Sequence, residues 1–225
     1  MAITVKHPRY MAGIAAGVVC TMFAPCIPAT PIAVFLTKQE DVYEAMVQSR
    51  HALIRKYGPT PEKLEAFPKV GSWAKYMLWD FFPASYNCPY ETERVGVLGD
   101  GGKWVCGLSR LVDKPNCVVY SAGHTFIDIL KVDIEGSEFD TLTSMIKYFK
   151  ERGRPLPFGQ LQLEIHADKI TFAQFLKWWE DLEEAGLRPF WTEPNLLYTN
   201  WFRNAPSYTE YSFLNVGGNH DIIRG

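Results

Sequence analysis

The chain has 225 residues, of which 47% are hydrophobic and 14% aromatic, which supports one buried core and excludes an intrinsically disordered chain. A formal net charge of −2 gives no sign of a nucleic-acid partner. The five cysteines form no CxxC pair and no Cys/His ligand spacing, which argues against a structural zinc site.

The N-terminal region contains a long stretch without charged side chains, residues 10–37, between Arg9 and Lys38. It exceeds the roughly 20 apolar residues that a membrane-spanning helix needs, and its prolines are tolerated in such a helix. Because basic residues precede it, the positive-inside rule keeps residues 1–9 in the cytosol. We therefore predict a single-pass anchor at 10–37 and a lumenal remainder in the secretory pathway, in the endoplasmic reticulum or the Golgi.

Two other interpretations of this stretch remain. A cleaved signal peptide would have the same basic start and an apolar run from Met11 to Ala24, and a buried helix of a soluble protein is the third possibility. The first two interpretations both lead to a compartment where disulfides form. Cys88, Cys106 and Cys117 would then lie in the lumen, and an odd number of cysteines cannot all pair internally.

After the anchor, residues 38–92 are expected to form a helical and aromatic collar. Lys38 to Tyr57 is predicted to be an exposed helix with a loose apolar stripe that includes Val42 and Ile54. The following segment, 59–92, is rich in proline and aromatic residues, which suggests packed structure rather than a flexible linker. The remaining residues, 93–225, are the predicted main domain.

Two apolar runs in this domain resemble consecutive buried strands, Cys117 to Gly123 and Phe126 to Asp133. Only His124 and Thr125 separate them, whereas parallel neighbouring strands need a connection of about a dozen residues or more. We therefore expect either an antiparallel hairpin or one continuous bent strand between Cys117 and Asp133.

The rest of the domain alternates helices and strands. A helix is predicted to begin at Ser137-Glu-Phe-Asp140, a strand at Leu161 to His166, and a second helix at the capping box Thr171-Phe-Ala-Gln174, closed by Gly186. Short strands are expected near 189–191, 196–199 and 211–216. This order predicts an α/β fold.

The first candidate binding motif is Gly99-Asp-Gly-Gly-Lys-Trp104. Its glycines allow close approach of the backbone to a ligand, and Lys103 adds a positive charge that suits a carboxylate or phosphate. A simple β-turn containing Asp100-Gly101 is the competing interpretation.

The second motif is Asp133-Ile-Glu-Gly-Ser-Glu138. Asp133 and Glu135 lie where a strand ends and a helix begins, which is where open α/β sheets bind ligands, and Gly136 permits a tight turn. Such carboxylates can hold ribose or amino groups, coordinate a cation or act as a base. Alternatively, Glu135 and Glu138 serve only to favour the helix N-terminus.

The third motif is Glu164 and His166, which share one face of a predicted central strand with Gln162. Burying three polar side chains is costly without a purpose. They could meet Asp133 across neighbouring strand ends, for proton transfer or for a divalent metal, or they could form a structural network. We take Asp133, Glu164 and His166 as the catalytic candidates and assign no metal.

Several segments together resemble the methyltransferase-like domain family related to FkbM-type methyltransferases, which includes membrane-anchored eukaryotic members. The resemblance covers about residues 72 to 216. The segments that carry it are Gly99 to Cys106, Cys117 to Gly123, Ile129 to Glu138, Leu161 to His166, Phe190 to Asn195 and Glu210 to Asn215.

This resemblance implies a Rossmann-like fold that binds S-adenosylmethionine. Tyr120 to Gly123 would form the first strand and its turn beside the methionine part of the cofactor. Asp133 and Glu135 would end the fourth strand near the transferred methyl, and Glu164 and His166 would lie on the fifth. The cofactor-binding candidates are Asp100, Gly101, Lys103, Gly123, Asp133 and Glu135.

The sequence departs from the family pattern between the first and fourth strands, where a whole section is lacking, together with the acidic residue that grips the ribose and the adenine contacts. The expected fold is therefore a truncated Rossmann-like methyltransferase sheet. The function is predicted as methyl transfer to an unknown small-molecule or glycan acceptor, with activity in this form left open. The alternatives are a non-catalytic membrane-anchored scaffold and a Golgi-type glycosyltransferase using Asp133-Ile-Glu135 as its metal motif.

Overall fold

In a computed structural model of the protein, the described part of the chain is built around a four-stranded mixed sheet. The structure describes residues 30–69, 74–97, 101–112, 125–202 and 205–224. Pro31–Gly225 forms one compact unit. In spatial order the strands are β3 (Ile127–Val132), β4 (Phe158–His166), β6 (Tyr208–Asn215) and β5 (Leu187–Pro194).

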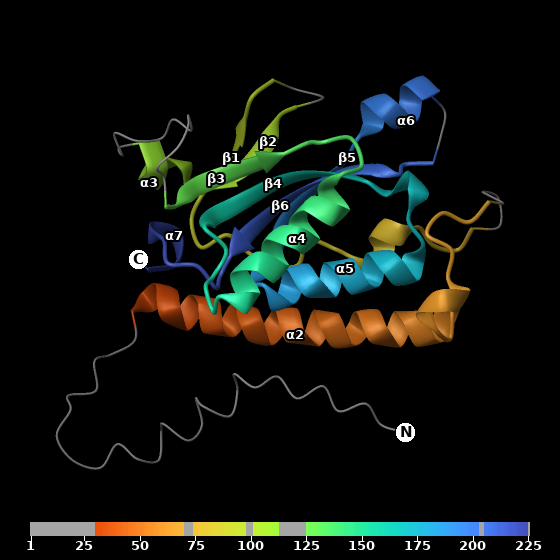
Figure 1. The fold of residues 1–225 in the computed structure, drawn as a ribbon, viewed down its shortest axis with the longest axis horizontal. Helices are drawn as coiled ribbons and strands as arrows, with labels where there is room; N and C mark the ends of the chain where they lie inside the picture. Colours follow the sequence, from red (N-terminus) through yellow and green to blue (C-terminus); the bar gives the residue numbers. More distant parts are fainter. Residues whose placement is uncertain (1–29, 70–73, 98–100, 113–124, 203–204, 225) are drawn as a thin grey trace, which may run out of the picture. The chain divides into compact units, whose positions relative to one another are not determined.

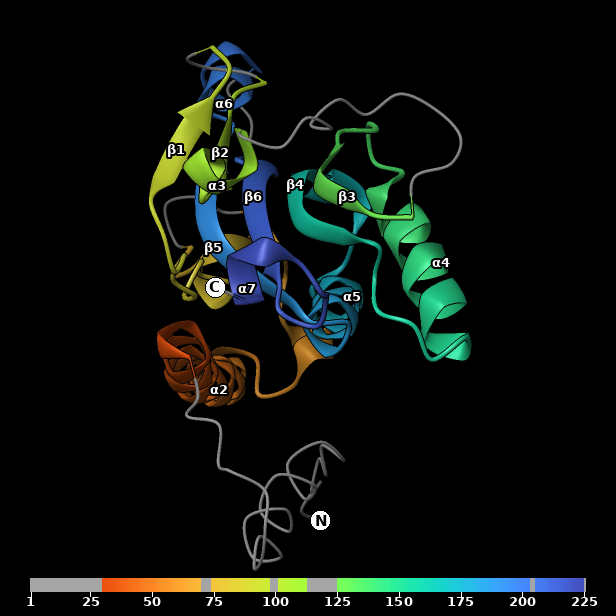
Figure 2. The same cartoon turned by 90° about the vertical axis from the view of Figure 1, so that its left-hand side faces the viewer.

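The strand directions follow from the connections. β3 and β4 are parallel because helix α4 (Glu138–Glu151) returns the chain between them. Helix α5 (Phe172–Glu184) follows β4, and β6 runs antiparallel to both β4 and β5. The predicted α/β order is thus confirmed. Within the described residues β3 lies at one edge of the sheet, as Figure 2 shows.

The central strand β4 is buried at every position, and its two faces differ in polarity. Leu161, Leu163 and Ile165 point into the main hydrophobic core on the side of α4 and α5. The alternate residues are polar and equally buried, which confirms the predicted polar face: they are Gln160, Gln162, Glu164 and His166. Helices α2 (Pro31–Tyr57), α4 and α5 lie on one side of the sheet, and a small hairpin lies on the other (Figures 1 and 2).

Helix α5 begins and ends as predicted. The Thr171 hydroxyl accepts a hydrogen bond from the Gln174 backbone N–H, which completes the capping box. At the other end Gly186 adopts φ 94°, a left-handed conformation that suits glycine. The apolar side chains on one face of α5 are buried, and Trp178 and Trp179 pack in the core.

Helix α2 differs from its prediction. It begins at Pro31 rather than near Lys38, and it is not simply an exposed helix with an apolar stripe. Val42 is 54% exposed, whereas Arg50 is only 1% exposed. The buried face therefore carries a charge, whose partner comes from α5. The predicted apolar stripe is present in part, because Ile54 is 3% exposed and Leu53 packs against the core.

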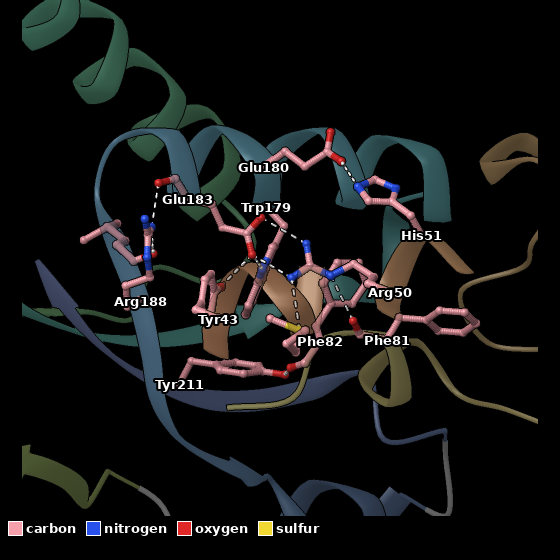
Figure 3. A network of polar contacts seen from close by, with 12 residues as sticks. Tyr43, Arg50, His51, Phe81, Phe82, Trp179, Glu180, Glu183, Arg188 and Tyr211 are labelled. Atoms are coloured by element: carbon pink, nitrogen blue, oxygen red, sulfur yellow. Dashed lines mark hydrogen bonds and ion pairs between the residues drawn. The ribbon is translucent and has the colours of Figure 1, made fainter. Parts of the chain in front are cut away.

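Figure 3 shows this partner, Glu183, with Tyr43, Arg50, Trp179 and Arg188 around it. Together with Glu40, which binds Arg188, we call these residues the α2 network. Arg50 donates from Nη1 and Nη2 to Glu183, at 3.0 and 2.6 Å, and from Nε to the Phe81 carbonyl. The Tyr43 hydroxyl and the Trp179 indole also donate to Glu183. Arg188 donates to both Glu40 oxygens. The network joins α2 to α5 and β5.

The collar is packed, as predicted. Its described part contains two short 3-10 turns, η1 (Pro61–Lys63) and η3 (Leu78–Phe81). Leu78, Phe81 and Phe82 are almost completely buried, and the rings of Phe81 and Phe82 lie against Phe172 of α5. Aromatic packing of this kind fixes the segment to the domain.

The described part of the glycine-rich motif belongs to an antiparallel hairpin of β1 (Thr92–Val95) and β2 (Lys103–Cys106). The Gln160 side chain accepts from the Cys106 N–H and donates to the Cys106 carbonyl, which holds β2 over β4. A disulfide joins Cys88 to Cys106. Short helices α3 (Leu108–Val112) and α7 (Asp221–Arg224) complete this side.

One predicted strand is a helix. Residues 196–199 lie in α6 (Leu196–Phe202), not in a strand. The Asn195 side-chain oxygen accepts from the Tyr198 N–H, three residues on, so Asn195 caps the helix. The apolar Leu-Leu-Tyr run was misread because this cap outweighs β propensity.

The predicted anchor lies largely outside the described residues, as do the tail at 1–9 and the junction of Cys117 to His124. Residues 31–37 form the first part of α2. Among the helices that the structure describes, none is both long and apolar enough to cross a membrane.

Candidate functional site

Three polar side chains converge where two parallel strands end. Asp133 directly follows β3, while Glu164 and His166 lie at the end of β4. One ligand atom of each falls within 4.8 Å of the other two. The predicted meeting of Asp133 with Glu164 and His166 is therefore observed. With Glu135 and Glu138 we call this group the strand-end cluster.

Glu138 holds the imidazole of His166 in place. It is fully buried, and its Oε1 accepts the His166 backbone N–H at 2.6 Å and lies 3.0 Å from His166 Nδ1. Burial opposes the charged form of Glu138, but the hydrogen bonds from His166 outweigh it and lower the pKa of Glu138. Burial likewise lowers the pKa of His166, but Glu138, together with the charges of Glu164 and Glu135, outweighs burial and raises it. With Nδ1 facing Glu138, Nε2 remains for the site.

A tight turn presents Glu135 to the same place. Glu135 has φ 55° and Gly136 has φ 95°, so the predicted turn at Gly136 is present, and it needs a left-handed conformation at both residues. The Gly136 N–H donates to Glu138 Oε2. The Glu135 side chain is 86% exposed, and its Oε2 lies 3.6 Å from His166 Nε2.

Glu164 is oriented by Asn195, whose Nδ2 donates to Glu164 Oε1 at 3.0 Å. Directly across the strand pair lies a second carboxylate, Glu210 of β6. Burial raises the pKa of Glu210 to about 7, and the charges of Glu164 and Asp133 add to this effect against the pull of Lys103. Carboxylates are thus crowded at this end of the sheet.

Lys103 is buried and already paired with a carboxylate of the protein. It was predicted to meet an anionic ligand from the glycine-rich loop, but it lies on β2, is 6% exposed and forms an ion pair with Glu210. Gly101, with φ 82°, lies beside this strand, so the described part of the motif fits the turn interpretation. Asp100 and Gly123, also predicted to bind the cofactor, lie outside the described residues.

Three residues of the site were missed by the sequence. Glu138 was interpreted only as a helix-start charge, and Asn195 and Glu210 were not considered as site residues. Their partners are His166, Glu164 and Lys103, at sequence separations of 28, 31 and 107. Glu138 could have been found, because it lies within the acidic motif of residues 133–138. Nothing in the sequence around Asn195 or Glu210 indicated a role in the site.

The chemistry available here is that of carboxylates and one oriented imidazole at an open strand end. Such a group can accept a proton, and it can bind a cation, whether an ammonium, a sulfonium or a metal ion. Its position beyond the ends of β3 and β4 is where open α/β sheets bind ligands.

Two family models match the chain, one described as a methyltransferase domain over residues 39–126 and one as a methyltransferase FkbM domain over residues 119–189. Together these matches place residues 39–189 in a methyltransferase-like, FkbM-related family. All members of the strand-end cluster lie in the FkbM match of this methyltransferase-like chain. No curated protein and no solved structure matches it.

Proposed function

We propose that the protein is an S-adenosylmethionine-dependent methyltransferase that methylates an oxygen or nitrogen of its acceptor, with the acceptor proton removed at the strand-end cluster. One observation carries the proposal: Asp133, Glu164 and His166 converge beyond two adjacent parallel strands, inside the segment that matches the FkbM domain. Methyl transfer is in-line, so the protein has mainly to position two substrates and deprotonate one.

The acidic character of the cluster suits one end of the cofactor. S-adenosylmethionine supplies an electrophilic methyl on a sulfonium, and its methionine part carries an ammonium. Asp133, whose Oδ2 lies 3.5 Å from Lys131 Nζ, and the exposed Glu135 offer carboxylates to such cationic groups. For the ribose and adenine the described residues offer no comparable acidic side chain at the end of a further parallel strand, because β3 is the edge of the described sheet. The fit therefore concerns the methionine end.

The environment of the protein is proposed from the disulfide. Cys88 and Cys106 are joined, and such bonds persist in oxidising compartments. This supports a lumenal domain of the secretory pathway, held by a membrane anchor at residues 10–37, with a small-molecule or glycan acceptor. The test of location is protease protection of the domain in microsomes, with loss of protection after detergent.

A second candidate is a non-catalytic scaffold that keeps part of the fold. The edge position of β3 favours it, because the described sheet then lacks neighbours on the side where the nucleoside of a Rossmann-like fold is held. In this case the strand-end cluster is a remnant, and no cofactor binds with useful affinity.

Calorimetry of the full chain with S-adenosylmethionine separates the two candidates. For a methyltransferase we expect a micromolar Kd that weakens about tenfold, or about 1.4 kcal/mol, in Asp133→Asn. Asp140→Asn is the matched control, because it removes an exposed carboxylate from the first turn of α4 outside the cluster. A folded sample that does not bind at millimolar cofactor would reject the methyltransferase and support the scaffold.

A further inference from the structure

Buried negative charge at the strand-end cluster exceeds the positive charge that the described residues supply. Glu164 is 4% exposed, and the partner that holds it, Asn195, is a neutral amide. Two nearby cations are paired with other carboxylates: Lys103 with Glu210, and Lys131 with Asp133 at 3.5 Å. Within the described ranges no ion pair joins Glu164 to a basic side chain. Buried carboxylates are normally paired with a cation or coordinate a metal.

The geometry suits a single small cation. The ligand atoms of Asp133, Glu164 and His166 lie within 4.8 Å of one another. Two ligand atoms on opposite sides of one ion, at bond lengths of roughly 2.1 to 2.3 Å, are about 4.5 Å apart. Small side-chain movements therefore bring all three atoms to bonding distance, and Asp133 is exposed enough to make them.

Two of the three side chains, His166 and Glu164, are already held in place by neighbouring side chains. A metal-bound histidine usually directs its other ring nitrogen to a carboxylate, and Glu138 occupies that place at Nδ1 of His166. The second contact of Glu138, to the His166 backbone N–H, fixes the ring further. Asn195 in the same way holds Oε1 of Glu164 and leaves Oε2 for a ligand.

We propose that Asp133, Glu164 and His166 bind one divalent cation, with Glu138 and Asn195 as positioning residues. Two carboxylates and one imidazole form a ligand set between the oxygen sites of Mg²⁺ and the nitrogen- and sulfur-rich sites of zinc, and Mn²⁺ fits it best. Three protein ligands leave coordination positions for water and for an oxygen of a second molecule.

The inference deepens the proposed function, and its catalytic meaning rests on that function. A cation here would bind the acceptor oxygen, lower its pKa and fix its direction. The hydroxyl proton would then leave to solvent at the exposed edge, where Glu135 lies. The three ligands would act through the cation, instead of one of them serving as a free base.

Electron paramagnetic resonance of Mn²⁺ tests the site without any assay of activity. Free Mn²⁺ gives a six-line signal that disappears on binding, so MnCl₂ is titrated against the full chain in buffer without other divalent ions. We expect one site per chain, with affinity at least tenfold weaker in Asp133→Asn, Glu164→Gln and His166→Gln. The matched control Asp140→Asn should bind as the wild type does.

Far-UV circular dichroism verifies that each variant is folded, and Asp133→Asn decides the test if the two buried substitutions fail to fold. Absence of saturable Mn²⁺ binding, or binding unchanged in Asp133→Asn, would overturn the cation site. Cofactor calorimetry repeated in EDTA keeps the two proposals separate. Cofactor binding without Mn²⁺ binding removes the cation and leaves the methyltransferase, while Mn²⁺ binding alone keeps the cation site and removes the methyltransferase.

Discussion

Two buried polar groups of this protein are built in opposite ways. In the α2 network two arginines, Arg50 and Arg188, meet two glutamates, Glu183 and Glu40. Both oxygens of Glu183 accept hydrogen bonds, and the Arg50 guanidinium also lies over the Phe82 ring. Charge is balanced, and the donors and acceptors at the centre face one another inside the protein.

The strand-end cluster has neither property. Carboxylates outnumber cations there, and Glu164 faces a further carboxylate, Glu210, across a strand pair. Nε2 of His166 is directed toward the exposed Glu135. Charge balance therefore distinguishes the α2 network, which has a structural role, from the strand-end cluster, for which we propose a function. A balanced network is explained by its role in holding elements together, whereas an unbalanced one at a strand end supports the proposed ligand site.

The largest expected effect comes from breaking the balanced network. Glu183→Gln leaves Arg50 buried without its carboxylate, and removing one partner of a buried ion pair costs about 3 to 5 kcal/mol. Urea unfolding followed by circular dichroism measures the change. The exposed Glu184→Gln, one residue along α5, is the control and should cost under about 1 kcal/mol. Equal losses in both variants would mean that the α2 network is no stabilising joint.

The second effect is the dependence of stability on pH. The lowered pKa of Glu138 contributes stability that is present above its unfolded value and is lost as the pH falls. The raised pKa of His166 contributes stability that is present below its unfolded value and is lost as the pH rises. The carboxyl of Glu210, with its pKa raised to about 7, also favours the fold while protonated.

The three contributions together predict a maximum of the free energy of unfolding near about pH 5, with a fall of about 2 kcal/mol toward about pH 8. Urea unfolding across this range, in buffer without divalent cations, provides the measurement. A profile that rises from pH 5 to pH 8 would contradict the crowding of carboxylates at the strand end.

The smallest expected effect is a gain in the free energy of unfolding, in contrast to the loss expected for Glu183→Gln. Glu164→Gln removes one of two like charges that lie directly opposite in the sheet, a repulsion of up to about 1 kcal/mol. We expect this variant to be as stable as the wild type or more stable by that amount at about pH 8, in the same unfolding experiment. If Glu164→Gln lowered the free energy of unfolding as much as Glu183→Gln does, the strand-end cluster would be as important for stability as the α2 network.

The elements that the sequence predicted well are those specified locally. The capping box of Thr171 and Gln174 and the alternation from Leu161 to His166 need no distant partner to be recognised. Their signals lie within one helical turn or one strand. The apolar run after Asn195 was misread because a single side-chain cap, rather than composition, decided between strand and helix.

The sequence by itself determined the α/β order of the elements, the polar face of the strand that ends at His166 and the acidic residues that follow Val132, because periodicity and strand-to-helix order encode them. The tertiary structure alone decided that Arg50 is buried against Glu183, that Glu138 orients His166 and that Glu164 faces Glu210. These are contacts between residues distant in sequence, and only the packing of helices and the register of strands brings them together.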